Sequence, residues 1–166
     1  MIDLWIFYAL IPAYVANMLP ILARKIPGNY PMDFNLRLRG KRVLGDHKTW
    51  KGFFSGVIGG TLAGIVLLQI YWPFSFSAIS WSIAVSAGAL LGDAAKSFFK
   101  RQIGIMPGNP WIPFDEIDFT IGALALGSIV YFPGWETAIA VIVISGVGHV
   151  IVNHVSFYLG LRTEKW

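Results

Sequence analysis

The sequence contains no cysteine, which excludes disulfide bonds, thiol catalysis and cysteine-ligated zinc or iron–sulfur centres. Charged residues are also scarce, because Asp, Glu, Lys and Arg make up 13% of the 166 residues, against roughly 25% in soluble domains. Hydrophobic residues make up 55%, and the mean hydropathy is +0.62. This balance excludes a disordered chain, disfavours a water-soluble globule and predicts a polytopic membrane protein.

Stretches without Asp, Glu, Lys or Arg locate the membrane helices. A helix that crosses a bilayer needs about 20 apolar residues. The longest such stretch, 52–92, has room for two helices separated by the aromatic and proline-containing turn 72–77. We therefore predict an all-α, polytopic integral membrane protein with about five transmembrane helices in a single domain, 1–166. The predicted helices cover residues 4–23, 52–71, 78–95, 119–132 and 137–160, and the polar loops cover residues 24–51 and 96–118.

The basic residues orient the predicted helices. All 13 Lys and Arg residues fall in the two polar loops or in the C-terminal tail, which five helices place on the same side. Because cytoplasmic loops carry an excess of Lys and Arg, this side is expected to face the cytoplasm of a multi-pass cell-membrane protein, with the N-terminus outside. The residues outside the second loop that carry this asymmetry are Arg24, Lys25, Arg37, Arg39, Lys41, Arg42, Lys48, Lys51, Arg162 and Lys165.

Acidic residues lie where membrane helices meet the second loop. Asp93 ends an apolar run and precedes Lys96 by three positions, so it either pairs with Lys96 at the membrane surface or belongs to a site. Asp115 and Asp118 precede a predicted helix, where acids can satisfy free N–H groups. Alternatively, the two carboxylates face the same way on a helical turn and, with Asp93, hold Mg²⁺, which prefers oxygen ligands.

The end of the first loop, residues 45–52, places Lys48 and Thr49 beside glycines at the entrance of a predicted helix. This composition suits the binding of a polyanion, with lysine as a point charge for phosphate. Basic residues that flank a membrane helix also occur without any ligand. The sequence alone leaves both interpretations open.

Several residues within the predicted membrane helices call for a structural explanation. Asn17 either holds a neighbouring helix or lines a pocket. His149 and His154 are five residues apart, which does not stack them on one helix face, so we expect hydrogen bonds rather than a shared metal. A ridge of glycines predicts close helix packing, and its members are Gly56, Gly60 and Gly64.

Taken together, the motifs resemble the signature of the phosphatidate cytidylyltransferases, the CDP-diacylglycerol synthases. That signature joins a G-D-x-x-x-S-x-x-K-R run to a D-x-x-D pair. The matching residues here are Gly92-Asp93, Ser97, Lys100-Arg101, Asp115 and Asp118. The run 48–52 resembles the K-T-x-E-G loop of the family, with Lys51 in place of Glu. The short chain, the short spacing from Arg101 to Asp115 and the runs 39–50 and 109–111 resemble the compact archaeal branch, the CDP-archaeol synthases.

The resemblance, which extends from about Asn17 to the end of the last helix, implies a CTP-dependent nucleotidyltransferase. Such an enzyme transfers CMP from CTP to an unsaturated archaeal lipid phosphate, 2,3-bis-O-geranylgeranyl-sn-glycerol 1-phosphate. The products are CDP-archaeol and pyrophosphate, and Mg²⁺ is the cofactor. The implied partners are CTP, the lipid phosphate and membrane lipids, with no nucleic acid, and an oligomer is compatible with the sequence.

Two other functions compete with this one. A CDP-alcohol phosphotransferase is disfavoured, because the residues after Asp118 lack the further aspartates of that class. The remaining alternative is a small membrane transporter or lipid-binding scaffold without nucleotide chemistry, in which intramembrane Asp and His residues would act as relay groups.

The resemblance also suggests roles for individual residues. The expected catalytic residues are Asp93, Lys100, Arg101, Asp115 and Asp118, of which the three aspartates are the expected metal ligands. The expected nucleotide-binding residues are Asp46, Lys48, Thr49, Lys51, Lys96, Ser97 and Asn109. Lys100 and Arg101 would neutralise either the lipid phosphate or the pyrophosphate. This interpretation requires the carboxylates of Asp93 and Asp118 to lie close together.

Overall fold

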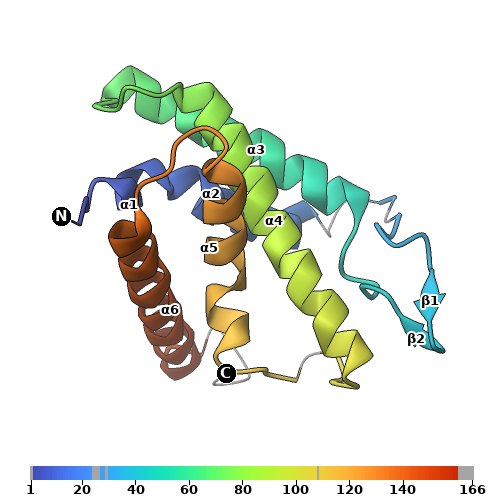
Figure 1. The fold of residues 1–166 in the computed structure, drawn as a ribbon. Coiled ribbons are helices and arrows are strands. Elements are labelled where there is room, and N and C mark those ends of the chain that lie inside the picture. Colours follow the sequence, from blue (N-terminus) through green and yellow to red (C-terminus); the bar gives the residue numbers. More distant parts are fainter. Residues whose placement is uncertain (1, 24–26, 29, 108, 161–166) are drawn as a thin grey trace.

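A computed structural model of the chain describes residues 2–23, 27–28, 30–107 and 109–160. Its helices, drawn in Figure 1, are α1 (Ile6–Ala9), α2 (Ile11–Ala23), α3 (Trp50–Ile70), α4 (Ala78–Gln102), α5 (Phe114–Gly127) and α6 (Trp135–Tyr158). A small antiparallel hairpin of β1 (Arg37–Leu38) and β2 (Lys41–Arg42) lies beside the C-terminal half of α4 (Figure 1).

Length and hydropathy single out the helices that can span a membrane. In the described part of the chain these are Ile6–Ala23 (α1 and α2 together), Trp50–Ile70, Ala78–Gln102 and Trp135–Val155. With α5, which has 14 residues, they make about five helical units, so the predicted all-α polytopic fold is confirmed. Four of the residues that carry the charge asymmetry lie outside the described residues, and these are Arg24, Lys25, Arg162 and Lys165.

Two helices differ in their bounds from the prediction. α4 continues to Gln102, seven residues beyond the predicted end at residue 95, and its last turn contains Lys100 and Arg101. α5 occupies Phe114–Gly127 rather than 119–132, with Asp115 and Glu116 in its first turn. A prediction from hydropathy ends a helix where charged residues begin. Acidic residues at the start of a helix and basic residues at its end nevertheless stabilise it. Both ends of the predicted loop 96–118 are therefore helical.

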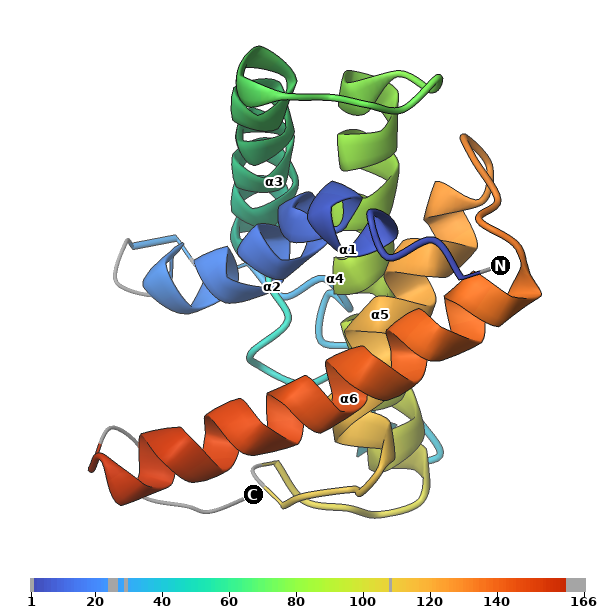
Figure 2. The same cartoon turned by 90° about the vertical axis from the view of Figure 1, so that its left-hand side faces the viewer.

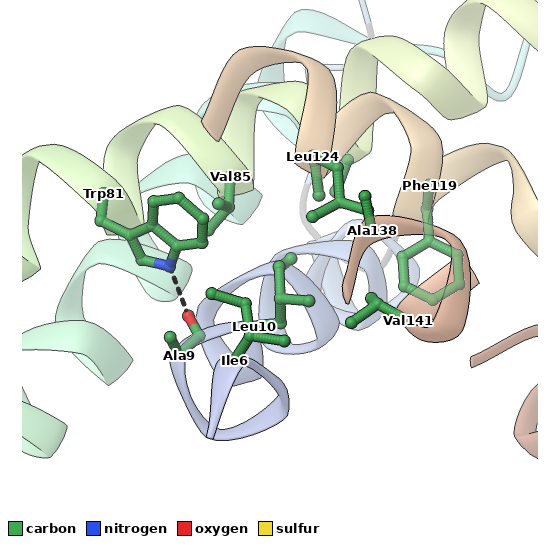
Figure 3. Packing of buried hydrophobic residues seen from close by; sticks show 12 residues of the cluster. Ile6, Ala9, Leu10, Trp81, Val85, Phe119, Leu124, Ala138 and Val141 are labelled. Atoms are coloured by element: carbon green, nitrogen blue, oxygen red, sulfur yellow. Dashed lines mark hydrogen bonds between the residues drawn. The ribbon is translucent and has the colours of Figure 1, made fainter. Parts of the chain in front are cut away.

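The apolar core lies where the N-terminal helices, α4, α5 and α6 meet. Figure 3 shows Trp81 of α4 against Ala9 of α1, whose carbonyl oxygen accepts a 2.7 Å hydrogen bond from the indole Nε1. Trp81 is fully buried, as are Leu10 and Val141 in the same cluster. A buried indole needs such a partner, so this contact fixes the start of the chain against α4.

Glycines bring the helix backbones into direct contact. A Cβ atom at Gly92 of α4 would lie 2.3 Å from the carbonyl oxygen of Asp118, and one at Gly122 of α5 would lie 2.2 Å from that of Gly88. Small residues permit such an approach between membrane helices. The predicted glycine ridge of α3 is confirmed as a packing surface, because Gly56, Gly60 and Gly64 are all buried. Figure 2 shows α3 beside α4, and α6 crossing α5.

Candidate functional site

Lys96 of α4 lies at the centre of a network of ion pairs. Its Nζ is 3.2 Å from a carboxylate oxygen of Asp93, 3.1 Å from one of Asp115 and 2.8 Å from one of Asp118. The close approach of α4 and α5 at Gly92 brings these three acids together, although they come from two helices. The carboxylates of Asp93 and Asp118 thus contact the same ammonium group, as the sequence interpretation required.

Two further lysines complete the network. Lys48, from the loop before α3, forms an ion pair with Asp93. Lys100 Nζ lies 2.9 Å from Asp115 and donates a 2.6 Å hydrogen bond to the carbonyl oxygen of Asn109. Buried charges are costly unless they are paired, and each of the three lysines here faces at least one aspartate.

A cavity of about 540 Å³ opens beside this network. The candidate residues on its wall are Asp46, Lys48, Asp93, Lys96, Ser97, Lys100 and Arg101. The β-hairpin contributes Lys41 and Arg42, and the turn after α4 contributes residues 104–107. Because basic side chains outnumber acidic ones on this wall, the cavity suits a polyanion.

The other expected nucleotide-binding residues are not on the wall of this cavity. Thr49 caps the N-terminus of α3, where its hydroxyl oxygen accepts a 3.1 Å hydrogen bond from the Gly52 N–H. Asn109 contributes its backbone carbonyl rather than its side chain to the Lys100 ammonium. Lys51 lies in the first turn of α3 and is not part of the large cavity's wall.

Sequence reasoning missed the contact that anchors the hairpin. The buried carboxylate of Asp33 accepts hydrogen bonds from Arg42 Nη2 at 2.9 Å and from the backbone N–H groups of Leu44 and Gly45 at 3.0 and 3.3 Å. Burial alone would raise the pKa of Asp33, but these donors and the Asn35 N–H lower it to about 2. Arg42 also reaches Asp46 at 2.7 Å, which positions the wall of the cavity.

The lowered pKa of Asp33 makes the hairpin sensitive to acid. The carboxylate stabilises the fold above its unfolded pKa of about 3.9, and this contribution, of about 2 kcal/mol, is lost as pH falls from about 4 to 2. We expect the hydrogen-exchange protection of the Leu44 and Gly45 amides to fall over this range. Asp33→Asn should lower that protection above about pH 4, where the wild-type carboxylate is ionised, and equal protection in the variant and the wild type at pH 6 would contradict this account.

The acidic residues fit a divalent cation in their chemistry. Asp118 Oδ2 is buried, and the Lys96 ammonium lies 2.8 Å away. Asp93 and Asp115 present further oxygens to the same point. Among the residues that the structure describes, no group of three His, Cys, Asp or Glu side chains is arranged to hold a metal ion. Lys96 stands between the three carboxylates, so a metal would have to displace its ammonium group.

The two histidines confirm the expectation of internal hydrogen bonds. His149 Nδ1 pairs with the buried carboxylate of Glu116, which links α6 to α5. His154 Nδ1 lies 2.8 Å from the carbonyl oxygen of Val150, one turn earlier in the same helix. The partner of His149 depends on how α5 and α6 pack, which the spacing of the histidines does not indicate.

Comparisons with known proteins identify the family of this chain. The family model described as CarS-like, CDP-archaeol synthase, matches residues 1–166. A CDP-archaeol synthase of Thermofilum pendens is 40% identical over 98% of this chain and 79% of its own length, and one of Methanoculleus marisnigri is 35% identical over 95% and 100%. A solved structure of an intramembrane enzyme for archaeal membrane lipids biosynthesis is 32% identical, with a TM-score of 0.78 over 92% of this chain and 96% of its own. This chain is therefore a multi-pass membrane protein of the CDP-archaeol synthase family.

Proposed function

We propose that this chain transfers CMP from CTP to 2,3-bis-O-geranylgeranyl-sn-glycerol 1-phosphate, forming CDP-archaeol and pyrophosphate. The observation that carries the proposal is the convergence of Asp93, Asp115 and Asp118 with three lysines beside a largely basic cavity. Family membership supports the same reaction. We place the protein in the cell membrane with this cavity on the cytoplasmic side, because basic loops favour that side.

The residues of the network address the main barrier to this reaction. Both substrates are anions, and the phosphate monoester of the lipid is itself the nucleophile, so no Ser or Cys nucleophile is needed. Its oxygen forms a bond to the α-phosphorus of CTP, and the bond from that phosphorus to the bridging oxygen of the β-phosphate breaks. Lys48, Lys96 and Lys100 reduce the repulsion between the phosphates, and Arg101 adds positive charge to the same cavity.

We further propose that Asp93, Asp115 and Asp118 hold Mg²⁺. The convergence of three carboxylates from two helices on one point supports this assignment. When bound, Mg²⁺ supplies neutralisation of phosphate charge and orientation of the reacting oxygens. Lys96, once released by the carboxylates, can donate to a phosphate oxygen instead.

An apolar groove between α4 and α5 offers room for an isoprenoid chain. It measures about 500 Å³, its walls include Leu91, Phe99, Ile121 and Leu126, and Lys96 and Asp118 line it as well. A lipid tail in this groove would place its phosphate near the acidic network.

The direct test is a transfer assay with purified protein, radiolabelled CTP, Mg²⁺ and lipid phosphate. We expect label in the CMP part of CTP to enter the organic phase, whereas label in the AMP part of ATP should not. A parallel reaction with an ester-linked acyl phosphate measures the preference for ether-linked chains. CTP with Mg²⁺ should also raise the melting temperature of the protein in detergent. A transporter or scaffold would transfer no label and show no such stabilisation.

Replacement of Lys48 is expected to weaken nucleotide binding. Lys48→Ala should raise the KM for CTP roughly 10-fold or more, because a hydrogen bond to a charged group contributes about 1.5–3 kcal/mol. Initial rates over a range of CTP concentrations measure the effect. Arg37→Ala is the matched control, because Arg37 is exposed on β1 and is not part of the cavity wall. An unchanged KM for CTP in Lys48→Ala would remove Lys48 from the nucleotide site.

A further inference from the structure

A smaller cavity of about 220 Å³ adjoins the large one, and His47, Lys48 and Asp93 line both. The rest of its wall comes mainly from α2 and the beginning of α3, including Asn17, Pro20 and Phe53. The Lys48–Asp93 ion pair therefore borders two spaces, of which the proposed reaction so far uses one.

Asn17 is the residue in this smaller cavity that lacks an explanation. It is half-buried within the apolar segment Ile6–Ala23, yet its side chain forms no hydrogen bond with another described residue. An amide has two N–H donors and an acceptor oxygen. These groups are available to a ligand in the cavity that Asn17 lines, and polar residues within membrane helices commonly mark a ligand or its path.

The chemistry of the wall indicates what would satisfy this amide. Lys48 supplies a positive charge and forms an ion pair with Asp93, which Lys96 also contacts. The remainder of the wall is apolar on the side of α2, where Pro20 and Ile21 lie. An ammonium group and an amide donor beside an apolar surface suit a phosphate group at the edge of a membrane.

We propose that the cavity between α2 and α3 is a second phosphate pocket of this enzyme, in which Asn17 and Lys48 donate hydrogen bonds to a phosphate other than the α-phosphate of CTP. The inference rests on the proposed function, which supplies two such groups: the phosphate of the incoming lipid and the pyrophosphate that leaves. Asn17 is then a substrate-binding residue on a membrane helix, outside the family signature motifs quoted above.

Kinetics of Asn17→Ala test the proposal and distinguish the two phosphates. If the lipid phosphate binds here, its KM should rise at least fivefold while the KM for CTP and inhibition by pyrophosphate stay within twofold of the wild type. If pyrophosphate binds here, its inhibition constant and the KM for CTP should rise together while the KM for the lipid stays unchanged. Asn17→Asp should show a larger effect than Asn17→Ala in the same constant, because a carboxylate repels phosphate whereas its shape preserves packing.

A matched control is Asn153→Ala, which removes a buried amide from α6 that is not part of this cavity. It should leave all three constants unchanged, and melting temperatures in detergent establish that each variant is folded. Should Asn17→Ala fail to fold, Asn17→Ser serves in its place. A folded Asn17 variant with all three constants at wild-type values overturns the second pocket, whereas absence of transfer by the wild type overturns the proposed function itself.

Discussion

Asp93→Asn and Asp118→Asn are each expected to lower the rate of CMP transfer by roughly 10³-fold or more. Each substitution keeps the shape of the side chain but removes a negative charge from the point where the three carboxylates converge on Lys96. Several kcal/mol of charge stabilisation depend on such a centre, and about 1.4 kcal/mol corresponds to a factor of ten in rate. The measurement is transfer of radiolabel from CTP to lipid phosphate under saturating substrate.

Asp3→Asn is the matched control for these two variants. Asp3 accepts a hydrogen bond from the Trp5 N–H near the N-terminus and lies outside the acidic network, so its replacement should leave the rate unchanged. Loss of one carboxylate also leaves a buried lysine with fewer partners, so melting temperatures must accompany the rates. The rise in melting temperature that CTP with Mg²⁺ is expected to cause should disappear in both active-site variants. Near-normal transfer by either would exclude that aspartate from the site.

Gly122→Ala is expected to reduce transfer roughly 10²-fold and to lower the melting temperature. The added methyl group would lie 2.2 Å from the carbonyl oxygen of Gly88 and 2.8 Å from the Cα of Gly92, so α4 and α5 have to separate. Separation moves Asp118 away from Asp93 and Lys96, and a displacement of about 1 Å at a reacting centre costs on the order of 10²-fold in rate. Transfer assays and thermal unfolding in detergent measure the two effects.

The matched control is Gly148→Ala on α6, where a Cβ atom would have nothing within 4 Å. Alanine also favours a helix over glycine, so this variant should keep both its activity and its melting temperature. If Gly122→Ala behaved like Gly148→Ala, the glycine contact between α4 and α5 would not be what holds the acidic residues together.

The sequence predicted the helices of this fold well because a bilayer requires long apolar stretches, and few other arrangements of such stretches exist. It predicted the helix ends less well. Lys96 and Lys100 suggested a loop after residue 95, but charged residues continue α4 to Gln102 and line the site. Hydropathy measures the preference for lipid, and it does not distinguish a polar helix end from a loop.

Some residues of the candidate site could likewise be predicted from the sequence, and others could not. Asp93, Ser97 and Lys100 could be predicted together because they belong to one run of the family signature, and all three line the cavity. Lys41 could not, because its position on the cavity wall depends on a hairpin held by Asp33, 60 residues before Asp93 in the chain. Proximity in sequence was misleading for Thr49, whose hydroxyl caps a helix although its neighbour Lys48 reaches the acidic network.

The pairing of three lysines with three aspartates also bears on how this protein takes up its substrates. Because these three lysines already have ionic partners, a nucleotide that binds them must replace aspartates rather than enter an unpaired cationic site. A lone anion would draw lysines away and strand the carboxylates, and a lone cation would strand the lysines. Binding is therefore most favourable for an anion and a cation that arrive together, because each then replaces the partner that the other removes.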